Sequence, residues 1–528
     1  MNDRVKSRCG LCWCTCLIGQ LVWLSAAAGI EPTTQRARAN ENSALGINLG
    51  GVTYYSTEIV FVDLFKHSQP WKSQAPGRKY GQGGPLDLTP AGWIRSLMPG
   101  GQYADSIILS RLPGGYPAGI YTCLYDGQGE IRFAHGMETV ESSPGRIRVR
   151  VTPQTRLLQL RLVRTDPADP VRNIRFIMPG FEQVYERQPF HPEFLRRWQE
   201  FRVIRFMNWQ RTNRSDQKDW ADRPRPEMQT QGGPAGVALE YMIQLANTLQ
   251  ADPWFCIPHL ATDEYVRQFA RMVKARLDRG LCVYIEYSNE CWNSIFPQAR
   301  YCRERGLAAK LSRNAFQAQL FYYSKRSVEI FKIWEEVFGG TERLVRVLAA
   351  QAANPWTGIQ VMDFQQAYRH ADALAIAPYF GYALGNPAIQ DKVVSMTVDE
   401  ILDACERYIE QGNRTIARYA AEARRRGLEL IAYEGGQHLV GHGGAQDNKA
   451  LEKLFHAANR HPRMKQLYLK YLRGWKENGG RLFVLFSSMG KYSKWGSWGL
   501  MEYHGQPVSE APKYQAAIEF INHNPRWW

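Results

Sequence analysis

The chain has 528 residues, of which 44% are hydrophobic, and it carries a formal net charge of +16. This length exceeds the size at which one hydrophobic core usually stops growing, so we expect one large domain accompanied by a smaller one. The composition lacks the biases that mark disordered, collagenous or coiled-coil chains.

The first residues have the layout of a secretory signal peptide. Three basic residues precede an apolar stretch and a run of small residues at 25–28, which is the order of such a leader. We therefore expect residues 1–28 to be removed, residues 29–44 to form a mobile linker, and the mature protein to be secreted or periplasmic. No later segment has the ~20 uninterrupted apolar residues that a membrane helix needs.

The ten cysteines do not indicate a disulfide scaffold. Four of them lie in the expected leader, and the other six are sparse for a chain of this length. We expect those six to be buried free thiols, although Cys291 and Cys302 could bridge a loop. No metal site is expected.

The positive charge allows an anionic partner, such as a uronate or sulfated polysaccharide, a nucleic acid or a cell surface. The alternative is an arginine-rich but merely solvated surface. Basic stretches such as residues 424–426 have the appearance of helix exteriors, and no nucleic-acid fold signature accompanies them. We therefore expect no specific binding of nucleic acid.

Between about residues 86 and 181 the sequence alternates between apolar and polar residues in short runs separated by turns. Residues 120–125, 146–151 and 158–162 are examples. A period of two with frequent turn residues is typical of antiparallel strands. We predict a β-sandwich domain over residues 81–184.

After Pro189 the pattern changes to short apolar runs that alternate with long amphipathic segments, which indicates repeated βα units. The expected strands are residues 202–209, 252–259, 283–290, 343–351, 373–380, 428–435 and 481–488. The expected helices include residues 238–249, 263–278, 316–338, 398–426 and 447–477.

A closed barrel of this kind needs eight parallel strands, and residues 45–52 can supply the missing one. On this interpretation residues 45–80 hold the first barrel strand and helix, the sandwich is inserted after that strand, and residues 185–528 complete the barrel. The competing interpretation assigns residues 45–71 to the sandwich and the first strand to residues 172–179. Either way the predicted fold class is α/β, a (β/α)8 TIM barrel with an additional antiparallel β-sandwich.

The carboxyl ends of barrel strands are where an active site is expected. Two carboxylates, Glu290 and Glu434, end the fourth and seventh predicted strands, which lie across the mouth from each other. Breaking a glycosidic bond needs a proton for the leaving oxygen and a negative charge beneath the anomeric carbon. Two carboxyl groups in different environments can supply both.

Two segments resemble clan A glycoside hydrolases. Tyr-Ile-Glu-Tyr-Ser-Asn-Glu-Cys-Trp-Asn at 284–293 is similar to the fourth-strand Asn-Glu signature of that clan, and Ile-Ala-Tyr-Glu-Gly-Gly at 431–436 to its seventh-strand segment. The resemblance implies that Glu290 is the general acid/base, that Glu434 is the nucleophile, and that hydrolysis retains the anomeric configuration.

Further roles follow from the same resemblance. Asn289 resembles the clan residue that hydrogen-bonds the sugar 2-hydroxyl, and Arg205 resembles the second-strand arginine that pairs with the nucleophile. Tyr379 takes the sixth-strand place of a residue that hydrogen-bonds the nucleophile. His259 resembles the third-strand histidine near the glycone.

Aromatic side chains commonly form the platforms on which sugars stack. Trp209, Trp292 and Trp495 fall on or just beyond predicted strand ends, and we include them among the substrate-binding candidates. Trp498 lies nearby in sequence. The chain departs from the common clan pattern at residues 487–488, where two serines replace the usual tryptophan of the eighth strand.

The sequence therefore predicts a secreted retaining glycoside hydrolase that cleaves β-glycosidic bonds of a neutral or anionic poly- or oligosaccharide without a cofactor. The alternative is a non-catalytic carbohydrate-binding or surface-scaffold protein on the same barrel. A third possibility is a polyanion-binding protein, whose affinity would fall steeply with salt.

Overall fold

The computed structural model describes residues 39–110 and 112–528. The expected signal peptide and most of the expected linker lie outside these residues. Asn40, near the end of that linker, is buried, and its side-chain amide donates to the backbone carbonyls of Phe201 and Leu249 at 3.2 and 3.1 Å. The segment just before the first strand is therefore anchored to the barrel.

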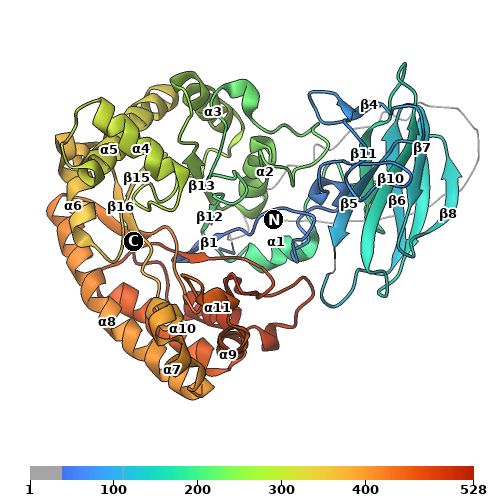
Figure 1. The fold of residues 1–528 in the computed structure, drawn as a ribbon. Helices are drawn as coiled ribbons and strands as arrows, with labels where there is room; N and C mark the ends of the chain where they lie inside the picture. The colour runs from blue at the N-terminus through green and yellow to red at the C-terminus, as the bar shows by residue number, and fades with distance from the viewer. Residues whose placement is uncertain (1–38, 111) are drawn as a thin grey trace, which may run out of the picture. The chain divides into compact units, whose positions relative to one another are not determined.

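Eight parallel strands close into a barrel (Figure 1), as predicted. Around the barrel they are β1 (Leu45–Asn48), β12 (Val203–Arg205), β13 (Asp252–Ile257), β14 (Val283–Tyr287), β15 (Leu344–Ala349), β16 (Ala373–Ile376), β17 (Glu429–Ala432) and β18 (Phe483–Phe486). Strand β1 pairs with both β12 and β18, which closes the barrel. Each strand is shorter than the apolar run that predicted it, because the last residues of each run leave the ladder and enter the loops at the mouth.

Helices surround the barrel (Figure 1). They are α1 (Pro192–Trp198), α2 (Leu239–Leu249), α3 (Asp263–Arg276), α4 (Pro297–Ala308), α5 (Ala315–Phe338), α6 (Pro355–Asp363), α7 (Gln390–Val394), α8 (Val398–Arg425), α9 (Lys449–Arg460), α10 (Arg463–Glu477) and α11 (Pro512–His523). Short 3-10 turns add η1 (Leu64–His67), η2 (Trp220–Asp222), η3 (Phe364–His370), η4 (Tyr382–Gly385), η5 (Pro387–Ile389), η6 (Ala445–Asp447) and η7 (Val508–Glu510).

The long helices begin where the sequence offers capping residues. The Thr262 hydroxyl accepts the Tyr265 N–H at the start of α3, and Thr397 and Glu400 form a capping box at the start of α8. The single helix expected at 447–477 is wrong. It is two helices, α9 and α10, because Pro462 holds the preceding residue in an extended conformation.

The residues between β1 and β12 form antiparallel sheets. Two have four strands, in the orders β2-β5-β10-β7 and β11-β6-β9-β8, and β3 pairs with β4. The strands are β2 (Lys72–Gln74), β3 (Asp87–Leu88), β4 (Ile94–Ser96), β5 (Tyr103–Ser110), β6 (Gly119–Asp126), β7 (Gly129–Phe133), β8 (Glu138–Ser143), β9 (Arg146–Val151), β10 (Leu157–Thr165) and β11 (Arg172–Ile177). Both larger sheets contribute to one cluster of buried side chains, separate from the cluster of the barrel.

Two expectations for this region are wrong. Strand β11 pairs antiparallel with β6, so residues 172–179 do not hold the first barrel strand. Residues 45–80, all of which are described, contain only the 3-10 turn η1 and the strand β2 after β1, and no barrel helix. The chain leaves the barrel after β1 and enters the antiparallel sheets through β2, which pairs with β5.

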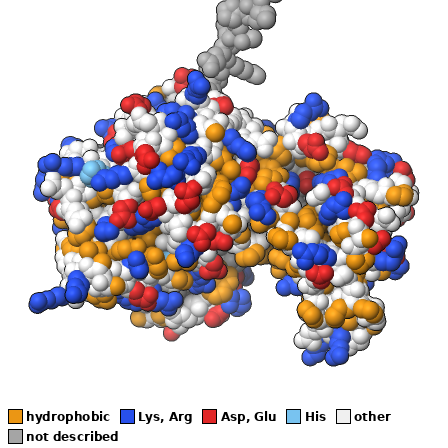
Figure 2. Space-filling view, turned by 90° about the horizontal axis from the view of Figure 1, so that it is seen from above, with side chains coloured by type: hydrophobic (Ala, Val, Ile, Leu, Met, Phe, Trp, Pro, Cys, Tyr) orange, Lys and Arg blue, Asp and Glu red, His pale blue; other side chains and the backbone are white. Residues whose placement is uncertain are grey.

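The surface mixes charges of both signs. Figure 2 shows Lys and Arg side chains interspersed with Asp and Glu over the visible face, rather than gathered into one basic area. Within the described residues, none of the helices combines the length and apolar character required to cross a membrane.

Candidate active site

Arg205, the last residue of β12, is fully buried at the centre of a polar network. Its Nη1 donates to Glu434 Oε1 at 2.9 Å and to Asn48 Oδ1 at 3.0 Å. Its Nη2 donates to Glu286 Oε2 at 2.7 Å and to Asn289 Oδ1 at 2.9 Å, and Nε also reaches Glu286 at 3.2 Å. One guanidinium therefore connects the ends of four barrel strands.

Glu434 lies two residues beyond β17 and is 6% exposed. Its second oxygen, Oε2, accepts the Tyr379 hydroxyl at 3.0 Å. Burial raises the pKa of Glu434 to about 7, although Arg205 and the Tyr379 hydrogen bond lower it, and the neighbouring Glu290 raises it further. Burial also raises the pKa of Tyr379 above its usual range, so this phenol stays a hydrogen-bond donor.

Glu290 follows β14 in a loop with an unusual backbone. Ser288 and Glu290 have φ angles of 59° and 44°, in the left-handed region that side-chain-bearing residues rarely adopt. The Glu290 carboxyl accepts the Tyr433 hydroxyl at 3.1 Å and the Asn293 amide at 2.8 Å. Burial raises its pKa as well. Both of these donors are neutral, whereas Glu434 contacts a cation.

Asn289 and His259 have different surroundings. The Asn289 side chain accepts from Arg205 and donates from Nδ2 to Asn213 Oδ1 at 3.1 Å, so its orientation is fixed beside the network. His259 is buried with its ring 5.4 Å from that of Tyr301, and burial lowers its pKa to about 4. Among the described residues, no hydrogen bond joins His259 to either glutamate.

The three tryptophans singled out in the sequence are not equivalent. Trp209 is a correction: it is fully buried, donates to the Gly50 carbonyl at 3.0 Å, and packs against core rings, so neither face can meet a sugar. Trp292 is half-buried and lies beside Tyr433. Trp495 is 65% exposed.

Sequence reasoning missed several contributors to this network. Asn48, Asn293 and Tyr433 supply hydrogen bonds to Arg205 or Glu290, and Glu286 supplies the second carboxylate on Arg205. The signal for Glu286 was a charged residue in an otherwise apolar strand. No comparable signal marked the other three residues.

Aromatic rings pack beside Tyr379, which hydrogen-bonds the nucleophile candidate Glu434. Trp498 lies 5.7 Å from Tyr379, 5.8 Å from Phe486 and 5.0 Å from His438, measured between ring centroids, with the rings edge to face. Phe486 is the last residue of β18 and precedes the two serines noted in the sequence. Trp498 lies in the loop that follows them. Burial lowers the pKa of His438 to about 4.

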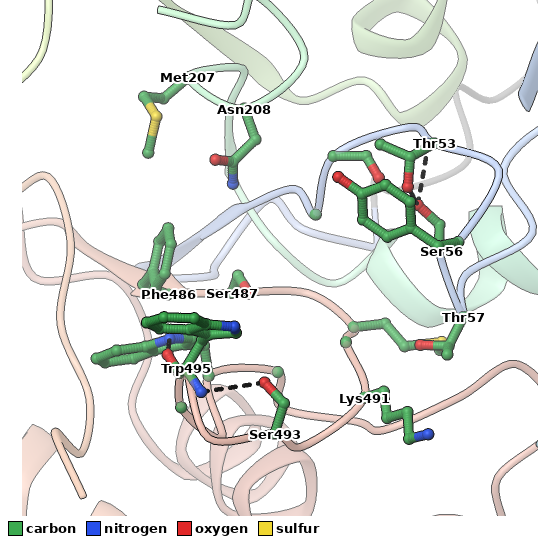
Figure 3. Close-up of a pocket in the computed structure, with 18 of the residues that line it drawn as sticks. Thr53, Ser56, Thr57, Met207, Asn208, Phe486, Ser487, Lys491, Ser493 and Trp495 are labelled. Carbon is green, nitrogen blue, oxygen red and sulfur yellow. Dashed lines mark hydrogen bonds between the residues drawn. The ribbon is translucent and has the colours of Figure 1, made fainter. Parts of the chain in front are cut away.

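A cavity of about 730 Å³ adjoins this group of side chains. The loops after β1, β12 and β18 line it, and Figure 3 shows Phe486 and Trp495 across from Thr53 and Ser56, with Asn208 on a third side. Neither Glu290 nor Glu434 lines the cavity. Of the residues that line it, Asn213 binds Asn289, and Phe486 and Trp498 pack against Tyr379.

In the part of the chain that the structure describes, no group of three or more His, Cys, Asp or Glu side chains is arranged to hold a metal ion. The six cysteines outside the expected leader are unpaired, and all but the partly exposed Cys282 are buried. In the structure Cys291 and Cys302 are therefore not bridged.

The site thus belongs to an eight-stranded α/β barrel that brings the buried Glu434 and the half-buried Glu290 to one end. No family model matches the chain, and no curated protein matches it. Its structure is similar to those of glycoside hydrolases. One is the GH51 arabinofuranosidase from Xanthomonas axonopodis pv. citri, at 10% identity and a TM-score of 0.38 over 64% of this chain and 67% of that one.

An exo-β-1,4-mannosidase from Opitutaceae bacterium strain TAV5 is similar at 12% identity and a TM-score of 0.36, over 63% of this chain and 55% of that one. A 4-O-α-L-rhamnosyl-β-D-glucuronidase from Fusarium oxysporum 12S is similar at 12% identity and a TM-score of 0.37, over 60% and 61%. The chain spans less than two thirds of the length of these two proteins.

Proposed function

We propose that the protein is a retaining glycoside hydrolase that cleaves β-glycosidic bonds of a poly- or oligosaccharide. The observation that supports this most directly is the contrast between the buried carboxyl group of Glu434 and the half-buried one of Glu290 at one barrel mouth. Glu434 accepts from the Arg205 cation, whereas Glu290 accepts from the neutral Tyr433 and Asn293. Such a pair can divide the roles of nucleophile and acid between its members.

The electrostatics favour one assignment of the proton. Burial raises the pKa of both carboxyl groups, that of Glu434 to about 7, so the pair holds one proton until the pH approaches 7. Arg205 stabilises a negative charge on Glu434, whereas Glu290 has only neutral donors, and we propose that the shared proton resides on Glu290. This is the arrangement that a retaining glycosidase requires before its first step.

The reaction proceeds by double displacement. Glu434 attacks the anomeric carbon while Glu290 gives its proton to the departing glycosidic oxygen, which forms a glycosyl ester on Glu434. Glu290, now ionised, takes a proton from an incoming water, and that water displaces Glu434. For this chemistry we expect the carboxyl groups to lie ~5–5.5 Å apart.

The surrounding residues have supporting roles in this proposal. Tyr379 orients Glu434 through its hydrogen bond, and Asn289, held by Arg205 and Asn213, is placed to meet a sugar hydroxyl. The exposed ring of Trp495 offers a stacking face.

We further propose that the two larger antiparallel sheets form a β-sandwich inserted after β1, and that residues 1–28 direct secretion. The sandwich begins before the predicted residue 81, because β2 pairs with β5 in one of its sheets. Support for the sandwich comes from the order of the strands, since β2 to β11 lie between β1 and β12 in the chain and share one buried cluster. Support for secretion comes from the layout of the leader alone.

The test is turnover on a panel of neutral and anionic polysaccharides by the mature protein and three variants. Glu290→Gln and Glu434→Gln should each lose activity by about 10³-fold or more, because each removes a group that acts in both steps. Glu429→Gln is the matched control: it lies on the same strand as Glu434 but is exposed, and it should retain activity.

Activity that survives in both Glu290→Gln and Glu434→Gln would contradict the proposal. Inactivity of the wild type across the panel, together with measurable sugar binding, would favour the alternative of a non-catalytic carbohydrate-binding protein.

A further inference from the structure

The cavity beside the carboxyl pair carries charged side chains of only one sign. Among the described residues that line it, the charged ones are Arg211, in the loop after β12, and Lys491, in the loop after β18. No aspartate or glutamate is among these lining residues. The two cations come from loops that are far apart in the sequence, and the fold brings both to the lining of one cavity.

Neither cation is neutralised within residues 39–110 and 112–528. No carboxylate among the described residues pairs with Arg211 or Lys491. Nearby basic residues differ in this respect: Lys494 lies 2.7 Å from Asp447, and Arg223 lies 3.1 Å from Glu240. The cavity therefore presents a positive potential to whatever enters it.

Arg211 is held in a conformation that costs free energy. It is half-buried, and its φ of 50° is in the left-handed region, where residues other than glycine and asparagine are uncommon. The chain makes room for it at Gly236, where an added Cβ would lie 3.1 Å from Arg211 Cγ and 2.1 Å from the Trp209 carbonyl oxygen. The side chain of Arg211 is thus directed by its packing.

The rest of the lining suits a sugar. Hydroxyl and amide groups line the cavity together with the cations, and the exposed Trp495 offers a ring face on the side that Phe486 also lines (Figure 3). The lining groups of this kind are Thr53, Ser56, Thr57, Asn208, Asn213, Ser487 and Ser493.

We propose that this cavity binds an acidic sugar residue, whose carboxylate or sulfate group contacts Arg211 and Lys491, so that the substrate is an anionic glycan. The hydrolysis of such a glycan depends on the proposed function, whereas its binding does not. A guanidinium recognises either anion through paired hydrogen bonds. Uronates and sulfate esters share this chemistry, and the experiment separates them.

The experiment measures binding by calorimetry to the Glu290→Gln variant, which is expected to bind without turnover. The probes are two matched pairs: tetrasaccharides of β-linked mannuronate with their carboxyl-reduced form, and κ-carrageenan tetrasaccharides with their desulfated form. We expect at least one acidic probe to bind about tenfold or more tightly than its neutral counterpart, which is the effect of one charged hydrogen-bond partner.

Adding Arg211→Gln or Lys491→Gln should abolish that preference while leaving the weak binding of the neutral form. Lys491 is exposed, so its replacement leaves folding intact. Arg214→Gln is the matched control, because Arg214 also has a left-handed φ, of 64°, but is exposed and does not line the cavity.

Equal affinity for acidic and neutral probes, a preference that persists in both variants, or binding of none of the four probes would overturn the inference. Failure of the proposed function has a different signature: an acidic probe would bind through Arg211 and Lys491, and the wild-type protein would leave it uncleaved.

Discussion

Arg205 is buried among two carboxylates and two amides, each of which replaces water around the guanidinium. A buried cation needs such partners, since an unpaired charge in the interior costs several kcal/mol. Burial and the neighbouring Glu290 explain why the pKa of Glu434 is raised to about 7 despite its contact with arginine.

Replacing Arg205 by methionine should therefore destabilise the fold strongly. Removing one partner of a buried ion pair typically costs about 3–5 kcal/mol, because the other charge stays buried and unpaired. Urea denaturation would measure the change. Arg300→Met, at an ion pair whose side chains are 64% and 67% exposed, should cost at most about 1 kcal/mol. Equal effects of the two replacements would contradict this view of Arg205.

Tyr379→Phe tests the hydrogen bond to Glu434. The Tyr379 hydroxyl lowers the pKa of Glu434, so its removal should raise that pKa. The nucleophile must be ionised, and the acidic limb of the pH profile of kcat/KM should therefore move to higher pH. A profile recorded between pH 4 and 9 would measure the shift. An acidic limb that stays in place, or moves to lower pH, would show that Tyr379 does not act on Glu434.

Among individual residues, the sequence predicted those at strand ends better than those whose side chains reach across the barrel mouth. Glu290, Glu434, Arg205 and Tyr379 were predicted from their places at strand ends, and the structure joins the last three by hydrogen bonds. The prediction that Trp209 binds sugar was wrong, because a residue just past a strand can turn back into the core. Its position in the sequence does not reveal that turn.

Glu58 is another buried carboxyl group, and its contacts join the ends of β1 and β18. It accepts the Trp198 indole N–H at 2.7 Å and the Ser488 hydroxyl at 2.9 Å, and Ser488 in turn accepts the Gly50 N–H at 2.8 Å. Burial raises the pKa of Glu58 from 4.5 to about 7. This carboxyl group thus stabilises two strands whose loops line the cavity.

Glu58→Gln should change how stability depends on pH. Between pH 4.5 and 7 the unfolded chain releases the Glu58 proton while the folded chain keeps it, so wild-type stability falls as pH rises through this window. The glutamine variant lacks this loss. Relative to wild type, its free energy of unfolding should rise by about 3 kcal/mol from pH 4.5 to pH 8.

Urea denaturation at several pH values would test this, with the exposed Glu304→Gln as a control that should stay within about 0.5 kcal/mol of wild type. A difference between Glu58→Gln and wild type that is constant with pH would show that Glu58 is not protonated in the folded protein.

The helices and strands were largely predictable, because the period of the hydrophobic pattern is a property of the local sequence. The βα alternation after Pro189 located β12 to β18 and most helices, and their ends shifted by a few residues. Helix α4 was missed because its residues carry many charges and little apolar periodicity. The division between α9 and α10 was missed although Pro462 marks it.

Across the whole molecule the buried side chains fall into two clusters. One belongs to the barrel and the other to the antiparallel sheets. Separate clusters of buried side chains can unfold as separate cooperative units.

Calorimetry should therefore resolve two transitions. Leu160→Ala, in β10, should lower one and Leu348→Ala, in β15, the other, since each leucine is fully buried and its truncation costs about 2–5 kcal/mol. A single transition that both replacements lower equally would indicate one cooperative unit.

The eight-stranded barrel was predictable only by counting, since seven strands after residue 189 leave an edge that an earlier segment must close. That β1 pairs with β12, more than 150 residues later, is a long-range contact that no local pattern encodes. The cavity and its two unpaired cations are likewise products of loops that meet only in the folded chain.

The most direct test of the double-displacement account is the configuration of the first sugar released. The anomeric proton would be followed by NMR, immediately after the wild-type protein is mixed with a β-linked substrate found in the polysaccharide panel. The account predicts that the β-anomer appears first and converts slowly to the equilibrium mixture. Initial appearance of the α-anomer would contradict it, because Glu434 would then not form a covalent intermediate.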